Sequence, residues 1–438
     1  MASREIKVVK PYGGKFSGTI SVPGDKSISH RAAIFASLAS GQSVIENFLL
    51  SEDCLCTLKA LEVLGVKVRR NGAKLVVEGT AGEFNKPDIQ LDLGNSGTGM
   101  RLMAGLLAGQ GFTAEITGDA SLSSRPMRRI KEPLELMGAK VELLGHGGCA
   151  PIRVTGGSLK GIDYKMPVAS AQVKSCILIA GLFAEGLTIV TEPGKTRDHT
   201  ERMLRAVGAD LRVDGLVIKL NRSAGKKLSL KSRNWNIPGD FSSAAFWITA
   251  AACRKGSELA VENVGLNPRR TGFLDVLKRM GANVQIAECG KEWEPVGTIR
   301  VNGGRLTGTE VGGDEIPNLI DEIPLVAVAG VLAQGKTIIR NAEELRVKES
   351  DRISSICAGL RAFGVNVEEK KDGMIISGGS AIMGGGEVDS IGDHRIAMAM
   401  SVLALFGTGP VTIGNTACVA TSYPGFWDEL GKLTAGRQ

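Results

Sequence analysis

Apolar residues gather in six segments along the chain, and within each segment they occupy nearly every face of a helix. A helix that is apolar all round is typically buried rather than amphipathic. Asp, Asn or Ser opens each segment and Gly follows its end, and these are the usual signals for the two ends of a helix. We therefore predict six buried helices, which begin at Asp25, Asn95, Ser170, Asp240, Asp321 and Asp393.

A second pattern runs in step with these helices. Each buried helix is followed by a short strand and then by a more polar helix. This second helix ends in a five-residue phrase: Leu, any two residues, a small or apolar residue, and Gly. Alternating, strand-like residues follow the phrase. Self-similarity at intervals of 70 to 83 residues is typical of a repeat architecture, here an α/β one. The phrase begins at Leu61, Leu134, Leu204, Leu277 and Leu360, and a fragment of it begins at Leu430.

Six units suggest two domains of three units each, and one of these domains is discontinuous. The sixth unit lacks its closing strands, and the strand-like residues 1–22 are the simplest candidates to complete it. One domain then comprises 1–22 plus 240–438, and the other comprises 23–239. The chain crosses between them at Pro23-Gly24 and Pro238-Gly239, and Pro-Gly pairs suit a turn or hinge.

Composition narrows the class of function. Of 438 residues, 43% are hydrophobic and 23% charged, as in ordinary globular proteins, and the net charge of +7 fits an anionic partner. No Lys/Arg block occurs and only 4% of residues are aromatic, which argues against a nucleic-acid partner. No apolar run approaches the roughly 18 residues of a membrane span, and no apolar leader opens the chain, so we expect a cytoplasmic protein without a membrane partner.

Metal and nucleotide chemistry find little support. The eight cysteines form no Cys-x-x-Cys pair and the four histidines lack ligand-like spacing, so we expect no metal site. Residues 330–337, GVLAQGKT, match a phosphate-binding loop, but that loop requires a strand before it and a helix after it. The repeat places a helix C-terminus before a strand here, which argues against an ATP site.

The predicted helix starts carry more polar residues than capping requires. Helix N-termini offer unpaired N–H groups and a partial positive charge, which bind phosphates and carboxylates. If the six starts face a common cleft between the domains, that cleft is basic and contains two carboxylates, Asp321 and Glu349. This combination suits general acid–base work on an anionic substrate. The alternative, that these residues only cap their helices, stays open at this point.

Six motifs in order, GDKSISHR, LGNSGTGMR, SRPM, ASAQ, RVKESDR and GDHR, closely resemble those of the EPSP synthase (3-phosphoshikimate 1-carboxyvinyltransferase) family. The resemblance covers essentially the whole chain. It implies an inside-out α/β barrel fold, with two domains each of three βαβαββ-type units around buried helices. It also implies transfer of the enolpyruvyl group of phosphoenolpyruvate to the 5-hydroxyl of shikimate 3-phosphate, with release of phosphate, and needs no cofactor. We expect a monomer.

The resemblance also implies roles for individual residues. Asp321 accepts the hydroxyl proton, Glu349 serves proton transfer at the methylene carbon, and Lys26 touches both substrates. Asn95, Thr98 and Arg101 support the site. The residues implied for shikimate 3-phosphate are Lys26, Ser27, Arg31, Ser170, Ala171, Gln172, Arg197, Asp321 and Lys348, and those for phosphoenolpyruvate are Lys26, Gly97, Arg125, Gln172, Arg352 and Arg395.

Three positions depart from the pattern common in the family. Thr421 stands where many relatives have a lysine, Ala171 replaces a second serine, and Leu102 replaces a proline. These features resemble a subgroup with reduced sensitivity to glyphosate, an inhibitor of the phosphoenolpyruvate site, although that subgroup often has alanine at the position of Gly97. We hypothesise partial tolerance.

Two other functions remain to be weighed. UDP-N-acetylglucosamine enolpyruvyl transferase shares the implied fold, but that family usually carries a cysteine before an Arg-Pro pair, and the segment GDASLSSRPM has none. A non-catalytic anion-binding repeat protein is the second alternative. Pure anion binding gains nothing from Asp321 and Glu349 in a cationic cleft, which argues against it.

Overall fold

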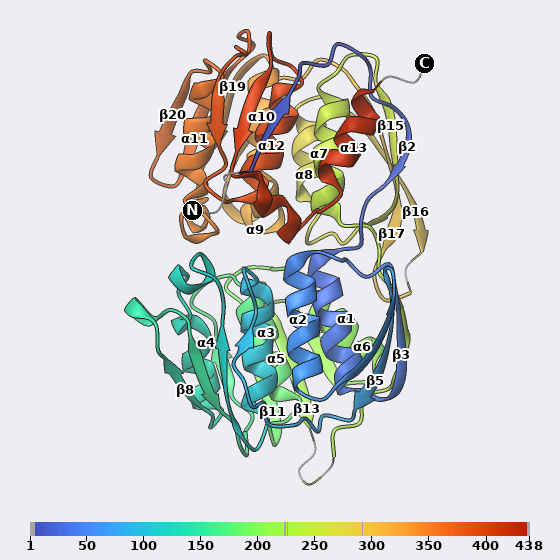
Figure 1. The fold of residues 1–438 in the computed structure, drawn as a ribbon, viewed down its shortest axis with the longest axis vertical. Helices are drawn as coiled ribbons and strands as arrows, with labels where there is room; N and C mark the ends of the chain where they lie inside the picture. Colours follow the sequence, from blue (N-terminus) through green and yellow to red (C-terminus); the bar gives the residue numbers. More distant parts are fainter. Residues whose placement is uncertain (1–4, 223–224, 226, 291, 436–438) are drawn as a thin grey trace. The chain divides into compact units, whose positions relative to one another are not determined.

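The computed structural model describes residues 5–222, 225, 227–290 and 292–435, and it divides the chain into two compact units. Unit 1 comprises Met1–Pro23 and Pro238–Gln438, and unit 2 comprises Gly24–Ile237. Both units mix helices with small open sheets (Figure 1), so the expectation of an α/β fold is confirmed. The expectation of a barrel is not: the described strands form six separate sheets of three or four strands, and no closed barrel is found among them.

Unit 2 contains three four-stranded sheets, and in each of them one edge strand pairs in parallel while the other pairings are antiparallel. The sheets are β14-β3-β5-β4, β6-β7-β9-β8 and β10-β11-β13-β12, formed by β3 (Ser40–Glu46), β4 (Lys67–Asn71), β5 (Lys74–Thr80), β6 (Leu91–Asp92), β7 (Thr113–Thr117), β8 (Lys140–Leu143), β9 (Ile152–Thr155), β10 (Asp163–Lys165), β11 (Gly186–Thr191), β12 (Leu211–Asp214), β13 (Val217–Arg222) and β14 (Asn234–Asn236).

The helices of unit 2 fall into two kinds. The apolar helices α1, α3 and α5 form its core, and α3 packs against both α1 and α5. Small residues allow this close packing: a Cβ added at Gly105 in α3 would lie 2.3 Å from the carbonyl oxygen of Cys176 in α5. The helices are α1 (Lys26–Leu38), α2 (Glu52–Val63), α3 (Gly97–Ala108), α4 (Arg128–Leu136), α5 (Ala171–Gly181) and α6 (His199–Ala206).

The described strands of unit 1 form two four-stranded sheets and one three-stranded sheet. Of the N-terminal strands, β1 pairs with β23 as expected, but β2 pairs with β15, so only β1 completes the last unit of the chain. The sheets are β16-β17-β15-β2, β18-β19-β21-β20 and β1-β23-β22, formed by β1 (Ile6–Val9), β2 (Ser17–Ser21), β15 (Glu258–Gly265), β16 (Asn283–Gly290), β17 (Val296–Asn302), β18 (Glu310–Val311), β19 (Gly335–Ile339), β20 (Val367–Lys370), β21 (Gly373–Gly378), β22 (Glu387–Asp389) and β23 (Val411–Gly414).

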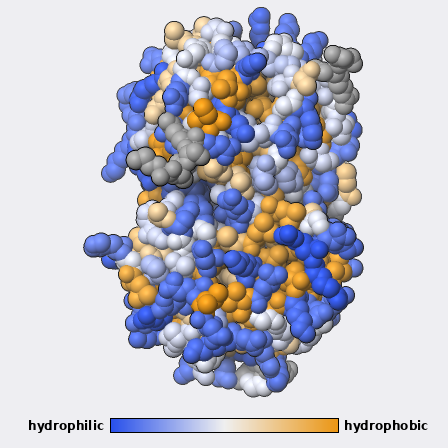
Figure 2. Space-filling view, viewed as in Figure 1, coloured by the Kyte–Doolittle hydropathy of each residue, from blue (hydrophilic) through white to orange (hydrophobic). Residues whose placement is uncertain are grey.

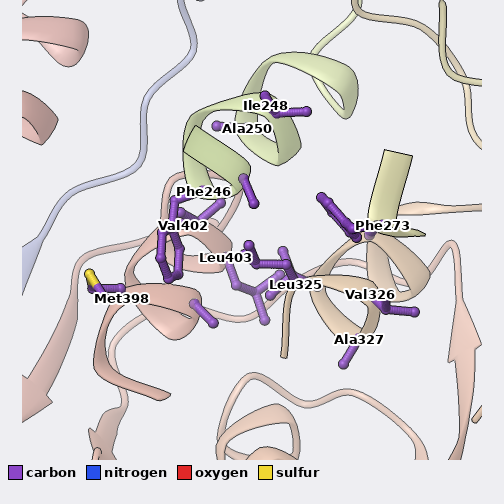
Figure 3. Packing of buried hydrophobic residues seen from close by; sticks show 14 of the residues in the cluster. Phe246, Ile248, Ala250, Phe273, Leu325, Val326, Ala327, Met398, Val402 and Leu403 are labelled. Carbon is purple, nitrogen blue, oxygen red and sulfur yellow. The ribbon is translucent and has the colours of Figure 1, made fainter. Parts of the chain in front are cut away.

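The core of unit 1 is formed by α7, α10 and α12, which pack against one another. Figure 3 shows Phe246 of α7, Leu325 of α10 and Leu403 of α12 converging in this core. Burial of such apolar surface is the main stabilising contribution to a fold of this kind. The helices are α7 (Phe241–Ala252), α8 (Gly272–Arg279), α9 (Ile316–Leu319), α10 (Ile323–Leu332), α11 (Arg352–Ala362), α12 (His394–Ala404) and α13 (Phe426–Thr434).

The starts of two buried helices differ from the sequence-based expectation. Ser96, not Asn95, caps α3, because its hydroxyl accepts from the backbone N–H of Gly99 at 2.9 Å. Asp321 does not cap α10 but lies in a 3₁₀ turn before it, Ile320–Glu322. The match to a phosphate-binding loop covers the end of α10 and the start of β19, so it lacks the strand–loop–helix order that such a loop requires.

The face in Figure 2 shows hydrophilic residues over most of the surface of each unit, with smaller apolar patches between them. Within the described ranges, no helix is both long enough and apolar enough to cross a membrane.

Candidate active site

The polar starts of the buried helices form one group of side chains in each unit. In unit 2 the group lies at the N-termini of α1, α3 and α5. Asp25 caps α1 through the N–H of Ile28 at 2.9 Å, and Ser170 caps α5 through the N–H of Val173 at 3.4 Å. These caps leave the next residues, Lys26 and Ala171, in the first turns of their helices.

Hydrogen bonds join the starts of α3 and α5. Gln172 receives a hydrogen bond from the Arg101 guanidinium at 2.7 Å and donates one to the Thr98 hydroxyl at 2.8 Å. Arg125, which is 7% exposed, donates to the side chain of Asn95 and, at 3.2 Å, to its backbone carbonyl. The three residues predicted to support the site, Asn95, Thr98 and Arg101, therefore hold the side chains of Arg125 and Gln172.

The start of α1 carries cations that are held by partners. The Lys26 ammonium forms an ion pair with Asp53 of α2 at 3.0 Å. Arg31 is 3% exposed and hydrogen-bonds the Ser27 carbonyl at 2.8 Å. Arg197 lies in the segment between β11 and α6, half-buried. Lys26 and Arg31 thus lie in α1, and Arg197 lies in the segment that leads into α6.

A buried histidine also lies among these helices. His30 of α1 hydrogen-bonds Thr57 of α2 at 2.8 Å and lies 3.4 Å from the hydroxyl of Ser96, the cap of α3. Burial lowers the pKa of His30 well below its usual value, and the charges of Lys26 and Arg31 lower it further. The ring is therefore neutral near pH 7, and it adds no charge to this group.

In unit 1 the guanidinium of Arg352 is the centre of the second group. This side chain is 1% exposed, and three carboxylates surround it: Asp393 at 2.8 Å, Glu349 at 2.6 Å and Asp321 at 3.3 Å. Burial opposes the charge of Arg352, but the three carboxylates outweigh it and raise the pKa of Arg352 above its usual value. The guanidinium is therefore charged near pH 7, and the three carboxylates hold it in place.

Arg395 at the start of α12 holds the 3₁₀ turn that carries Asp321. It donates to the backbone carbonyl of Asp321 at 2.8 Å and to the hydroxyl of Ser242 at 3.2 Å. Its guanidinium also lies 3.6 Å from the carboxylates of both Asp321 and Glu322. The Asp321 carboxylate therefore lies between two guanidiniums, those of Arg352 and Arg395.

Sequence reasoning missed several residues of these groups. Asp53, Ser175, Thr200, Ser242 and Arg270 each contact a predicted site residue or its immediate partner. They stand outside the quoted motifs or are unremarkable polar residues within a helix, so no signal in a single sequence distinguishes them. Thr421 bears no charge; its hydroxyl donates to the Cys418 carbonyl at 2.7 Å and lies 3.5 Å from Nδ1 of His394.

In the part of the chain that the structure describes, no group of three or more His, Cys, Asp or Glu side chains is arranged to hold a metal ion. What the two groups share is cationic side chains beside carboxylates, which suits proton transfer on an anionic substrate.

Comparison with known proteins shows the family of this chain. The family model for EPSP synthase (3-phosphoshikimate 1-carboxyvinyltransferase) matches residues 11–430. A 3-phosphoshikimate 1-carboxyvinyltransferase of Akkermansia muciniphila is 50% identical over 427 residues, with 95% of this chain and 97% of that protein covered. One from Geobacillus thermodenitrificans is 48% identical over 419 residues, with 95% of this chain and 96% of that protein covered.

Solved structures agree. An EPSP synthase from Acinetobacter baumannii has a TM-score of 0.86 and 44% identity, with 99% of this chain and 98% of that chain covered. The enolpyruvyl transferase NikO from Streptomyces tendae has a TM-score of 0.79 at 19% identity, over 98% of both chains, and shows the shared fold. The family match and the named relatives identify a transferase. The chain belongs to the EPSP synthase (3-phosphoshikimate 1-carboxyvinyltransferase) family.

Proposed function

We propose that the protein transfers the enolpyruvyl group of phosphoenolpyruvate to the 5-hydroxyl of shikimate 3-phosphate in the shikimate pathway and releases phosphate. Family membership over nearly the whole chain supports this reaction. The observation that carries the chemistry is the placement of the Asp321 carboxylate, 3.3 Å from Arg352 and 3.6 Å from Arg395. A base next to two guanidiniums can take a proton where anionic substrates are held.

The proposed reaction balances in two steps. In the first, the 5-hydroxyl oxygen attacks the internal vinyl carbon of phosphoenolpyruvate, its proton passes to Asp321, and the methylene carbon gains a proton through Glu349. In the second, the methyl group of the tetrahedral intermediate returns a proton to Glu349 as the C–O bond to the phosphate breaks, which restores the double bond, and the proton held by Asp321 passes to the released phosphate or to water. Lys26, Arg125, Arg352 and Arg395 offset the negative charges of the two substrates.

The remaining candidates divide between the substrates. We propose that Ser27, Arg31, Arg197 and Lys348, with the start of α5, hold shikimate 3-phosphate. The start of α5 contributes Ser170, Ala171 and Gln172, whose N-terminal position in a helix favours an anionic group. Gly97, at the start of α3, and Gln172 take part in holding phosphoenolpyruvate, together with Arg125, Arg352 and Arg395.

Phosphate release tests the reaction directly. The purified protein is mixed with phosphoenolpyruvate and either shikimate 3-phosphate or UDP-N-acetylglucosamine. We expect release only with shikimate 3-phosphate, abolished by Lys26→Ala. Release only with the nucleotide sugar would assign the alternative acceptor, and no release with either would return the non-catalytic anion-binding protein to first place.

Lys348 is expected to make the binding of shikimate 3-phosphate sensitive to alkaline pH. Burial lowers the pKa of its ammonium from the usual 10.5, and Asp321 and Glu344 oppose this shift. The charged form exists below the lowered pKa, so the attraction for a phosphate is lost as pH rises through it. We expect KM for shikimate 3-phosphate to rise with alkaline pH in the unmodified protein and to stay level in Lys348→Arg, since a guanidinium keeps its charge. Parallel profiles in the two proteins would contradict this role.

Gly97→Ala is expected to raise KM for phosphoenolpyruvate several-fold without unfolding the protein. A Cβ at this position would lie 2.9 Å from Nη1 of Arg101 and 3.2 Å from Nη1 of Arg125, which are the ends of flexible side chains. The guanidiniums must shift, and Arg125 is a proposed ligand of phosphoenolpyruvate. Gly105→Ala is the contrast, because its Cβ would meet backbone and overpacking there costs about 1–3 kcal/mol. Steady-state kinetics and thermal unfolding of both variants separate the two effects.

Finer features of the molecule remain proposals. We propose that the Pro-Gly pairs at 23–24 and 238–239 act as hinges, which is supported by the unit boundaries at Pro23/Gly24 and Ile237/Pro238. We also propose that the six sheet-and-helix units are copies of one repeat, since four-stranded sheets in both units share one strand connectivity. A monomer and a cytoplasmic location stay predictions, as does partial tolerance to glyphosate. Scattering profiles with and without both substrates test the hinges, and sedimentation tests the monomer.

A further inference from the structure

Arg31 is held in place by side chains from two other helices of unit 2. Its Nε donates to the hydroxyl of Thr200 in α6 at 2.7 Å, and its Nη2 donates to the hydroxyl of Ser175 in α5 at 2.7 Å. Its Nη1 donates to the carbonyl of Ser27 in its own helix at 2.8 Å. All three nitrogens of the guanidinium thus have partners, so its plane as well as its position is determined. In Figure 1, α1, α5 and α6 lie in the same unit, and α1 contacts α6.

The two hydroxyls form a chain whose direction follows from hydrogen counting. Arg31 can only donate, so both oxygens accept from it. Ser175 donates its own hydrogen to the carbonyl of Ala171 at 2.6 Å. The two hydroxyl oxygens lie 2.7 Å apart, so the hydrogen between them belongs to Thr200. Every hydroxyl hydrogen is then used, and the chain ends at Ala171, next to Ser170 and Gln172 at the start of α5.

Buried charges anchor the two helices that carry these hydroxyls. Lys174, the neighbour of Ser175, forms ion pairs with Glu201, the neighbour of Thr200, at 2.7 Å and with Glu192 at 3.0 Å. All three side chains are at most 2% exposed. Charges this deeply buried depend on their partners, because separating them leaves an uncompensated charge in the interior. The ion pairs therefore hold α5 and α6 in one register, in which Ser175 and Thr200 face each other.

We propose that Ser175 and Thr200 are positioning residues that fix the guanidinium of Arg31 for shikimate 3-phosphate. This inference rests on the proposed function of Arg31. A guanidinium that is already oriented loses less conformational freedom when the substrate binds, and this gain appears as affinity. Neither hydroxyl needs to touch the substrate for this effect.

The test compares Thr200→Val with Thr200→Ser. Valine matches the shape of threonine and removes the hydroxyl, whereas serine retains it. We expect Thr200→Val to raise KM for shikimate 3-phosphate about tenfold, a change of about 1.4 kcal/mol. KM for phosphoenolpyruvate stays within twofold, and Thr200→Ser restores the unmodified value. Ser175→Ala is the second variant, in case valine at position 200 disturbs folding, and thermal unfolding monitors both.

A cycle with Arg31→Met separates positioning from general damage. If Thr200 acts through Arg31, Thr200→Val adds nothing to the KM of the Arg31→Met protein. Additive effects, an equal rise in KM for both substrates, or failure of serine to rescue would each overturn the proposal. If the Arg31→Met protein still releases phosphate and its KM for shikimate 3-phosphate is unchanged, the proposal is also overturned. Absence of release in the unmodified protein would instead remove the proposed function.

Discussion

Replacing Asp321 by asparagine is expected to lower kcat for phosphate release by roughly 10²–10⁴-fold, the usual contribution of a general base. Asparagine retains the size of the side chain and an oxygen that can face Arg352 and Arg395, which lie 3.3 and 3.6 Å from the carboxylate. It cannot take up the proton of the attacking hydroxyl. We therefore expect the loss in kcat, with KM for both substrates changing much less.

Steady-state phosphate release with each substrate varied in turn measures this effect. Glu310→Gln is the matched control, because it makes the same chemical change at an exposed carboxylate of unit 1, whose side chain is 56% exposed and paired with Arg340. It is expected to leave kcat unchanged. A kcat in Asp321→Asn within about threefold of the unmodified protein would fall well below the usual contribution of a base and contradict the role of Asp321.

Arg352→Met is expected to destabilise unit 1 by about 3–5 kcal/mol, the usual cost of leaving buried charges without their partner. The side chains of Arg352 and Asp393 are 1% and 0% exposed, and their ion pair at 2.8 Å is shielded from solvent. Removing the cation leaves Asp393 buried without this partner, and Glu349 and Asp321 lose the guanidinium that they share with it. Binding of phosphoenolpyruvate is expected to be lost as well.

Urea unfolding measures the first effect, and substrate binding by calorimetry measures the second. Arg340→Met is the control, since its ion pair with Glu310 is exposed on both sides and such pairs contribute about 0–1 kcal/mol. Equal losses of stability in the two variants would show that the buried cluster does not stabilise the unit through Arg352.

The sequence by itself determined the elements and their order. Segments that are apolar on every face can only be buried helices, and their polar caps mark where most of them begin: Asp25, Ser170, Asp240 and Asp393 each cap the expected helix. Such signals act between residues close in the chain, so one sequence is enough to detect them. Motifs of several residues in register likewise sufficed for the family, which the comparisons confirm.

Predictions of helix starts and strand partners were wrong where two neighbouring signals were equally good. Asn95 and Ser96 are both good caps, and only the path of the chain decides that Ser96 serves α3. Asp is a residue type that commonly caps helices, yet the Asp321 carboxylate does not cap α10. It contacts the guanidiniums of Arg352, 31 residues away, and Arg395 instead. Strand β2 alternates like β1, but it pairs with β15 because strand pairing depends on which edge is open, and this is a property of the assembled sheets.

Only the tertiary structure decided how the candidate residues are held. Arg31 hydrogen-bonds Thr200 and Ser175, which are 169 and 144 residues away in the sequence. Arg352 hydrogen-bonds Asp393, which is 41 residues away. Ser, Thr and Asp are common at such positions in any helical protein, so their residue types carry no trace of these partners. The sequence shows which residues are charged, whereas the orientation of each charged group depends on buried neighbours that come together only when the chain folds.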